Sequence, residues 1–263
     1  MVYFVGAGSG AVDLITVRGA ELLGRADIII YAGSLVNPEL LDKYATKKAE
    51  RYDSAYLTLE EVIELIKKGE SRKLTTVRLH TGEPSLYGAV REQMDELDRL
   101  GIGYESCPGV TACFAAAASL NMEYTLPEVS QSLIITRMEG RTPVPARESI
   151  ESLSAHKASM AIYLSSGMLG ELSERLVSGG YSADTPAAVV YRASWEDEKR
   201  IVCTVGTMAA EAKKSNINRQ AVVLVGDAVA HSFYERSRLY APDFETGYRK
   251  AGSVPGQPDS GSR

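Results

Sequence analysis

Short apolar runs alternate with amphipathic stretches along the first half of the chain. The apolar runs, which predict strands, cover residues 2–5, 28–31 and 74–79. The stretches with one apolar face, which predict helices, cover residues 14–23, 59–68, 89–100 and 111–120, the last with Thr111 as its N-cap. A strand, a helix and a second strand in this order predict a parallel sheet covered by helices.

The second half of the chain also alternates predicted strands and helices, but two of its strands are joined by a hairpin. Strands are predicted at residues 133–136, 160–164, 187–191, 200–203 and 221–225, and helices at 146–156, 169–177 and 207–214. The polar residues 195–198 between two strands indicate a hairpin, so this sheet is predicted to be mixed. The fold class is therefore α/β, with one α/β domain over residues 1–120 and a second over 121–230. Residues 231–263 form a C-terminal tail, predicted to be disordered from about residue 252, where Gly, Ser and Pro dominate.

Composition and charge exclude several classes of function. The 263 residues are 44% apolar and carry a net charge of −5, which argues against a general nucleic-acid backbone binder. No apolar run approaches the ~20 residues that cross a bilayer, and the first residues lack a basic signal-peptide region. Three cysteines and three histidines are scattered without metal-ligand spacing. We expect a cytoplasmic protein that binds neither membrane nor nucleic acid and holds no metal.

Three turns follow strand ends in the first half and carry the best candidate chemistry. They span residues 6–10, 81–84 and 108–112, and each combines glycine or proline with small residues. Ligands of open α/β sheets bind outside the carboxyl ends of the strands, where glycines let backbone groups approach closely. A nicotinamide dinucleotide site is disfavoured, because the first turn departs from G-x-G-x-x-G and the next strand lacks the acidic residue at its end.

These turns resemble the three cofactor turns of the tetrapyrrole methylases, which use S-adenosylmethionine. The matching segments are Gly6-Ala7-Gly8-Ser9-Gly10, Gly82-Glu83-Pro84 and Pro108-Gly109-Val110-Thr111-Ala112. Further segments resemble one branch, the precorrin-4 and cobalt-precorrin-4 C11-methyltransferases of cobalamin biosynthesis. They are residues 31–36, 80–82, 87–89, 127–131, 136–137, 140–145 and 190–195. The resemblance runs from residue 1 to about residue 250.

The resemblance implies two α/β domains with S-adenosylmethionine in the cleft between them, S-adenosylhomocysteine as the product, and a homodimer. Carried over position by position, it assigns the cofactor contacts to Ser9, Thr81, Gly82, Glu83, Leu86, Thr111, Ala112, Leu164 and Ala193. Pro84 favours an extended Glu83, so we expect its carboxylate to point out of the turn toward the ligand.

Two motifs depart from the family pattern. Where the family has Gly-Pro-Gly-Asp-Pro, this chain has Gly8-Ser9-Gly10-Ala11-Val12, and Glu83 replaces the usual aspartate. Loss of the proline and the aspartate is expected to loosen the first turn, with Asp13 as a partial substitute. These changes bear on cofactor affinity more than on the type of reaction.

A tetrapyrrole with many carboxylates needs local basic groups on an acidic chain. Arg137 and Arg141 flank turns of the second domain, as do Arg147 and Arg192, and guanidinium groups pair well with carboxylates. Arg141 is the strongest candidate because two prolines stiffen its loop. For each arginine the alternative is a solvated or internally paired side chain.

Two further residues are candidates for the substrate side. His80 ends a predicted strand and is either a proton shuttle or a buried hydrogen-bonding residue. Tyr87, like Tyr31 and Tyr191, either stacks on the macrocycle or packs in the core.

The implied reaction is an in-line transfer of the methyl group from sulfur to an electron-rich ring carbon, C11 of precorrin-4 or cobalt-precorrin-4. Such a reaction depends on positioning and needs no protein nucleophile or metal, so the sequence identifies no catalytic residue. Methylation of another carbon of uroporphyrinogen III or another precorrin remains an alternative. So does a module that binds a tetrapyrrole or nucleoside without turnover.

Overall fold

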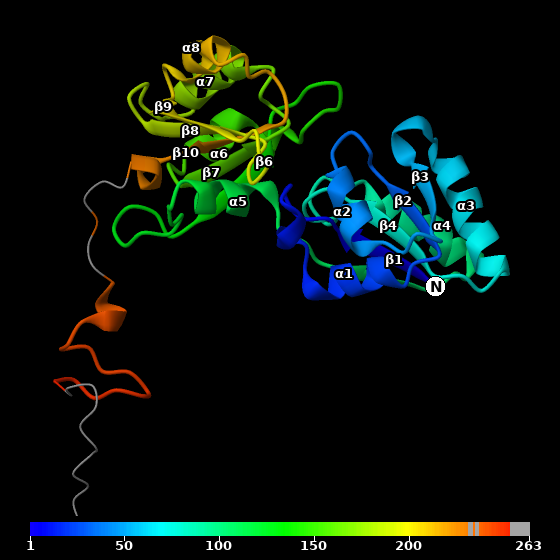
Figure 1. Ribbon diagram of the computed structural model, residues 1–263. Helices are drawn as coiled ribbons and strands as arrows, with labels where there is room; N and C mark the ends of the chain where they lie inside the picture. The colour runs from blue at the N-terminus through cyan, green and yellow to red at the C-terminus, as the bar shows by residue number, and fades with distance from the viewer. Residues whose placement is uncertain (231–233, 235–236, 253–263) are drawn as a thin grey trace, which may run out of the picture.

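The computed structural model describes residues 1–230, 234 and 237–252 and contains two five-stranded β-sheets flanked by helices (Figure 1). One sheet is parallel and the other is mixed, which confirms the predicted α/β class. The disorder predicted beyond residue 252 falls outside the described residues. Within them, no helix combines the length and the apolar character required to cross a membrane.

The first sheet has the strand order β3-β2-β4-β1-β5, and every pair in it is parallel. Its strands are β1 (Val2–Gly6), β2 (Ile28–Tyr31), β3 (Glu50–Asp53), β4 (Thr76–His80) and β5 (Tyr104–Cys107). The predicted runs at residues 2–5, 28–31 and 74–79 are therefore strands. The sequence pattern missed β3, whose residues Glu-Arg-Tyr-Asp are polar because this strand lies at the sheet edge.

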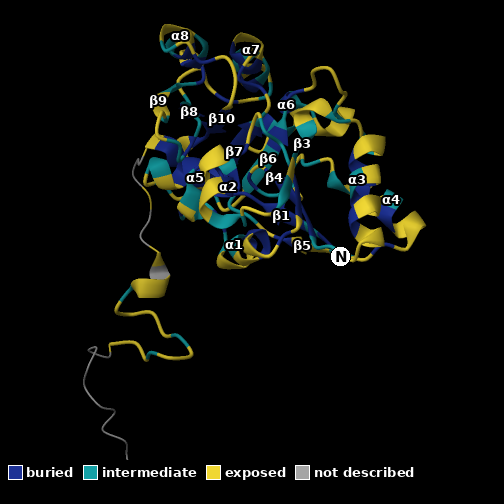
Figure 2. Cartoon of the chain, turned by 45° about the vertical axis from the view of Figure 1, so that its right-hand side comes forward, coloured by how far each residue is buried: buried dark blue, intermediate teal, exposed yellow. Residues whose placement is uncertain are grey.

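Helices cover both faces of the first sheet. They are α1 (Val17–Gly24), α2 (Pro38–Tyr44), α3 (Leu59–Ser71) and α4 (Val90–Leu100). The core on one face joins Leu22 and Leu40, from α1 and α2, to strand residues such as Leu79. The other core joins Ile66 of α3 and Leu97 of α4 to the opposite side of the strands. Figure 2 shows α3 and α4 with exposed residues facing outward.

The second sheet has the strand order β6-β7-β10-β8-β9, in which only the β6–β7 pair is parallel. Its strands are β6 (Leu133–Arg137), β7 (Ser159–Tyr163), β8 (Pro186–Tyr191), β9 (Lys199–Thr204) and β10 (Ala221–Val225). Strands β8 and β9 pair antiparallel from Tyr191–Lys199 to Pro186–Thr204, as the predicted hairpin at residues 195–198 requires.

Helices of unequal character cover the second sheet. They are α5 (Ala112–Ser119), α6 (Ile150–Ser154), α7 (Leu169–Ser178) and α8 (Met208–Lys214). Helices α6, α7 and α8 share one core, whereas α5 packs on the opposite face through alanines that permit close approach (Figure 1). Helix α5 thus packs on the second sheet although it precedes residue 120. The boundary between residues 1–120 and 121–230 stays a prediction.

The helix predicted over residues 146–156 is shorter than expected. A single 3-10 turn covers Ala146–Glu148, and α6 begins only after Ser149. Ser149 has extended backbone, and its side chain accepts a hydrogen bond from the N–H of Ser152. This cap starts a new helix and so interrupts the predicted one.

Backbone-to-backbone contact of three glycines joins the turns that follow β1, β4 and β5. A Cβ on Gly6 would lie 2.6 Å from the Cα of Gly109 and 2.6 Å from the carbonyl oxygen of Gly82. A Cβ on Gly109 would overlap that same carbonyl. Gly8 and Gly82 exchange backbone hydrogen bonds of 2.8 and 3.3 Å. The three turns therefore meet at one point because none of the glycines carries a side chain.

Replacement of Gly109 by alanine should destabilise the protein strongly. The atoms that the new methyl group meets are backbone and cannot rotate away, so we expect a loss of about 3 kcal/mol in the free energy of unfolding. Gly170→Ala in α7 is the matched control, because a Cβ there meets nothing within 4 Å; its effect should stay below about 1 kcal/mol. Denaturant unfolding of both variants measures the difference, and equal stabilities would contradict the close-contact argument.

Candidate active site

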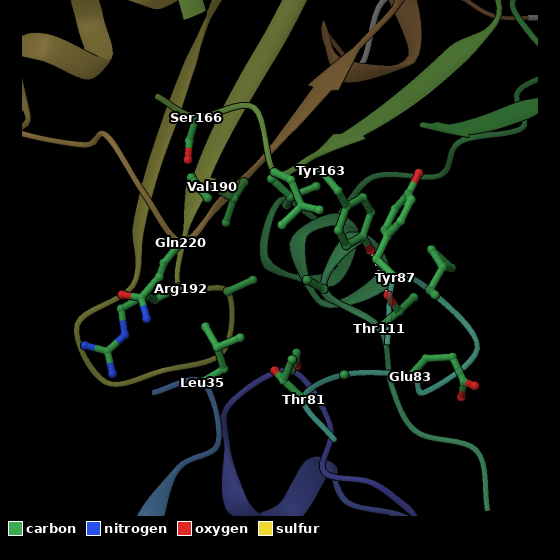
Figure 3. Close-up of a pocket in the computed structure, with 18 of the residues that line it drawn as sticks. Leu35, Thr81, Glu83, Tyr87, Thr111, Tyr163, Ser166, Val190, Arg192 and Gln220 are labelled. Atoms are coloured by element: carbon green, nitrogen blue, oxygen red, sulfur yellow. Dashed lines mark hydrogen bonds between the residues drawn. The ribbon is translucent and has the colours of Figure 1, made fainter. Parts of the chain in front are cut away.

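A pocket of about 240 Å³ opens between the two sheets (Figure 3). Its lining comes from the turns after β1, β2 and β4, the start of α5, the ends of β7 and β8, and the start of β10. The predicted cofactor residues that line it are Ser9, Thr81, Gly82, Glu83, Leu86, Thr111, Ala112, Leu164 and Ala193, which is the complete set. The structure brings these residues together, and their contact with a cofactor stays a prediction.

The carboxylate of Glu83 binds backbone rather than facing the pocket interior. Its two oxygens accept hydrogen bonds from the N–H of Gly109 at 2.8 Å and of Ser85 at 2.9 Å. Burial opposes ionisation, but these hydrogen bonds outweigh it and lower the pKa of Glu83 below its ordinary value. Figure 3 shows the carboxylate pointing away from Leu35 and Thr81. The carboxylate therefore does not extend out of the turn as expected, because two backbone donors lie within its reach. Its contact with a cofactor stays a prediction.

The altered first turn is held by the loop between β8 and β9. The hydroxyls of Ser9 and Ser194 lie 2.8 Å apart, and the Ser194 hydroxyl also accepts from the N–H of Ala11 at 3.1 Å. The indole of Trp195 donates to the carbonyl of Ser9 at 2.9 Å, and a Cβ on Gly10 would overlap this ring. The expected loosening is corrected: hydrogen bonds from the second half replace the missing proline. Asp13, the expected substitute, is exposed.

Tyr163, at the end of β7, contacts the third turn and the beginning of α5. Its hydroxyl lies 2.7 Å from the Thr111 hydroxyl and accepts from the N–H of Cys113 at 2.7 Å (Figure 3). Thr111 is the N-cap residue of α5, as predicted, but its side chain makes no capping hydrogen bond. Sequence reasoning missed Tyr163, although its place at a strand end, like that of the three turns, was a usable signal.

Some residues of the pocket wall have strained backbone. Tyr87, Leu164 and Arg192 have φ values of +56°, +54° and +47°, and all three line the pocket. Left-handed backbone is costly for non-glycine residues and gathers at functional sites. Ser166, which sequence reasoning also missed, reaches toward the pocket from the opposite side in Figure 3.

Of the substrate candidates, Tyr87 lines the pocket. Its side chain is 45% exposed, and its ring centre lies 5.7 Å from that of Tyr163. Arg137 and Arg141 do not line this pocket. The guanidinium of Arg137 donates to the carbonyls of Met138, Thr142 and Pro143, whereas Arg141 is exposed within the loop that Arg137 holds.

His80 lies outside the pocket lining, in the core beneath α3 and α4. Its ring stacks on Phe4 with centres 6.0 Å apart, and its side chain is buried. Burial, together with the nearby charge of Arg78, lowers the pKa of His80 to about 3. His80 is therefore neutral near pH 7, which argues against the proton shuttle. It is buried, as the alternative requires, but its Nε2 has no hydrogen-bond partner among the described residues, so the hydrogen-bonding part of that alternative is not borne out.

Three of the titratable side chains of the pocket, Glu83, Tyr163 and Arg192, are already engaged in hydrogen bonds or an ion pair. Arg192 pairs with Asp197 at 2.6 Å and lies 3.9 Å above the ring of Trp195. Of the two alternatives for this arginine, the structure therefore shows the internally paired side chain. Burial raises the pKa of both Tyr87 and Tyr163, so neither is a base near neutral pH. In the described part of the chain, no three His, Cys, Asp or Glu residues are grouped as metal ligands. The arrangement suits binding and orientation of a reactive ligand.

Comparisons with known proteins agree with this geometry. The family model of the tetrapyrrole (corrin/porphyrin) methylases matches residues 1–209. The cobalt-precorrin-4 C(11)-methyltransferase of Methanocaldococcus jannaschii is 49% identical over 250 residues, 95% of this chain and 96% of the relative. The precorrin-4 C(11)-methyltransferase of Pseudomonas aeruginosa is 44% identical, over 94% of this chain and 98% of the relative.

Solved structures show the same fold. The X-ray structure of a cobalt precorrin-4 methyltransferase, a cobalamin biosynthetic enzyme, has a TM-score of 0.85 and 42% identity over 87% of this chain and 95% of that one. A uroporphyrin-III C-methyltransferase of Thermus thermophilus, complexed with S-adenosyl homocysteine, shares the fold at 24% identity and a TM-score of 0.72. Because the family model covers most of the chain and curated relatives match nearly all of it, this protein belongs to the tetrapyrrole methylases.

Proposed function

We propose that this protein transfers a methyl group from S-adenosylmethionine to C11 of precorrin-4 or cobalt-precorrin-4. The observation that carries the proposal is that every residue the family resemblance assigns to the cofactor lines a single pocket between the two sheets. The named relatives methylate C11, with and without cobalt in their names, at 49% and 44% identity. A cytoplasmic homodimer is part of the same proposal and rests on the family resemblance.

The residues of the pocket fit a nucleoside with an amino-acid tail. Gly82, Ala112 and Ala193 have little or no side chain, so a ligand can approach their backbone N–H and C=O groups. At Gly82, with φ of +60°, a Cβ would lie 3.7 Å from the Cα of Thr111 and narrow the pocket. Thr81 and Ser166 supply hydroxyls from opposite sides of the pocket (Figure 3).

Positioning is the work that this site does for the reaction. Bound S-adenosylmethionine supplies a methyl group that its positive sulfur has already activated. Glu83 holds Gly109, and Tyr163 holds Thr111, so the turn between them has a defined place in the pocket. The protein must hold the acceptor carbon at about 3–3.5 Å from the methyl group and in line with the sulfur. No protein nucleophile is needed for this step.

The substrate side is proposed to be the open end of the pocket, near Tyr87 and the loop of Arg141. Tyr87 is partly exposed beside the pocket and offers an aromatic face for a macrocycle. Arg137 holds the backbone of residues 138–143 through three carbonyls and thereby orders the loop that carries Arg141. The exposed guanidinium of Arg141 is suited to a peripheral carboxylate of the substrate.

Methyl transfer to defined substrates tests the proposal. The purified protein is incubated with S-adenosylmethionine and either precorrin-4 or cobalt-precorrin-4, and the product is analysed by mass spectrometry and NMR. We expect S-adenosylhomocysteine release and a new methyl group at C11. A methyl group at another carbon would indicate a different tetrapyrrole methyltransferase, and binding without S-adenosylhomocysteine release would indicate a binding module. The substrate that is methylated faster indicates whether the natural substrate of this protein contains cobalt.

Glu83→Gln should loosen the third turn and weaken cofactor binding. An amide has one acceptor oxygen for the two backbone donors, so one of these hydrogen bonds is lost. We expect S-adenosylhomocysteine to bind about fivefold more weakly, which corresponds to ~1 kcal/mol, in calorimetric titration. Glu92→Gln, exposed on α4, is the control and should bind normally. Wild-type affinity in Glu83→Gln would remove Glu83 from the site.

The stability effect of the same substitution should depend on pH. Because the folded pKa of Glu83 is lowered, its contribution is complete above the unfolded value of about 4.5 and is lost as pH falls through the folded pKa. Glu83→Gln should therefore be less stable than the wild type at pH 7, by about 1–2 kcal/mol. The difference should shrink as the pH falls below about 4.5, and an unchanged difference in denaturant unfolding would contradict this assignment.

Arg141→Ala should weaken tetrapyrrole binding and leave cofactor affinity unchanged. A hydrogen bond to a charged group contributes about 1.5–3 kcal/mol, so the affinity for the tetrapyrrole should fall roughly 10- to 150-fold. The control is Arg99→Ala on α4, an exposed arginine paired with Glu96. Substrate and S-adenosylhomocysteine titrations measure the two affinities separately. If Arg141→Ala binds substrate like the control variant, Arg141 is not part of the site.

A further inference from the structure

The segment that connects the two sheets also forms part of the pocket. The chain leaves the first sheet at the end of β5, Cys107, and enters α5, which packs on the second sheet. Residues 108–113 are therefore the passage from one sheet to the other, and Thr111 and Ala112 within it line the pocket. The position of Thr111 and Ala112 in the pocket therefore depends on how each end of this segment is attached to its sheet.

Each end of this segment is held by a side chain from a different sheet. On the first side, the carboxylate of Glu83 accepts the N–H of Gly109. On the second side, the hydroxyl of Tyr163 binds the Thr111 hydroxyl and accepts the N–H of Cys113. The N–H of Cys113 belongs to the first turn of α5, whose donors have no partner within the helix. Tyr163 thus supplies, from a neighbouring strand, the cap that the Thr111 side chain does not supply.

The ring of Tyr163 reaches a second wall of the pocket. It contacts the ring of Tyr87 at a tilt of 48°, with the centres 5.7 Å apart. Tyr87 has left-handed backbone and belongs to the wall that we assign to the tetrapyrrole. The hydroxyl of Tyr163 therefore holds the cofactor side, and its ring supports the substrate side (Figure 3).

We propose that Tyr163 is a positioning residue for methyl transfer, which holds the Thr111–Ala112 turn in register with the wall formed by Tyr87. The inference rests on the proposed function, because it assigns the cofactor to that turn. Tyr163 acts through these neighbours and exchanges no proton with the substrate. Burial raises the pKa of its phenol, which keeps the hydroxyl protonated near neutral pH.

Tyr124 provides a matched control within the same region. Its hydroxyl donates to the carbonyl of Cys113 at 2.6 Å, so both tyrosines bind the backbone of one residue. Tyr124 is buried in the core between α5 and the second sheet and does not line the pocket. Tyr163→Phe and Tyr124→Phe each remove one hydroxyl group that forms a hydrogen bond with the backbone of Cys113. Only Tyr163 lines the pocket, so only the first change affects the pocket wall.

The test compares the two phenylalanine variants with the wild type in three measurements. Thermal unfolding should show a loss of stability in both, because each substitution removes a buried hydrogen bond to the backbone of Cys113. Calorimetric titration should show about tenfold weaker S-adenosylhomocysteine binding in Tyr163→Phe and less than a twofold change in Tyr124→Phe. Because misplacement of a reacting group is costly, kcat with saturating substrates should fall at least tenfold in Tyr163→Phe alone.

A double substitution shows whether Tyr163 acts through Thr111. If it does, adding Tyr163→Phe to Thr111→Val should weaken S-adenosylhomocysteine binding by much less than Tyr163→Phe does in the wild type. Additive losses would overturn this route.

Two outcomes separate the inference from the function on which it rests. A wild-type protein that binds S-adenosylhomocysteine, beside a Tyr163→Phe variant with the same affinity and kcat, would overturn the inference alone. Equal losses of affinity in Tyr163→Phe and Tyr124→Phe would also overturn it, because the effect would then be structural. A wild-type protein that binds no S-adenosylhomocysteine would overturn the proposed function, and the inference with it.

Discussion

The contact of three glycine backbones at the carboxyl ends of β1, β4 and β5 is the constraint on which the site depends. Gly6, Gly82 and Gly109 approach so closely that a methyl group on Gly6 or Gly109 would overlap backbone atoms of the others. This contact brings turns that are distant in the sequence to one end of the parallel sheet. The pocket then forms where these turns meet the ends of β7 and β8. A side chain at Gly6 or Gly109 would separate the turns and disrupt the site.

Around this contact, polar side chains from the second half of the chain hold segments of the first half. Ser194 and Trp195, in the loop between β8 and β9, bind the first turn at Ser9 and Ala11. Tyr163 binds the start of α5. Charges inside the pocket are neutralised or hydrogen-bonded, as Glu83 and Arg192 show. A protein of net charge −5 can therefore present a nearly neutral pocket, while Arg141 stays exposed outside the pocket lining.

The local sequence pattern was sufficient to predict an element wherever its own residues determine its structure. The apolar run Ile28–Tyr31 predicts a buried strand, and it forms β2 inside the first sheet. Gly101 predicts a helix end, and it ends α4 in left-handed conformation. Pattern failed where a neighbour decides the outcome. The polar edge strand β3 pairs only because β2 lies beside it, and Ser149 interrupts a continuous helical pattern by capping a shorter helix.

The sequence by itself determined the α/β class, the positions of the three turns and the family, because hydrophobic period, glycine placement and motif spacing are local properties of the chain. Only the tertiary structure decided what the side chains of the site do. The carboxylate of Glu83 accepts the N–H of Gly109, 26 residues away in the sequence. The indole of Trp195 donates to the carbonyl of Ser9, 186 residues away, and covers Gly10. The side chain of His80, at the end of β4, stacks on Phe4 and does not line the pocket. Hydrogen bonds form between the groups that folding brings within about 3 Å, and no sequence pattern specifies which distant groups those are.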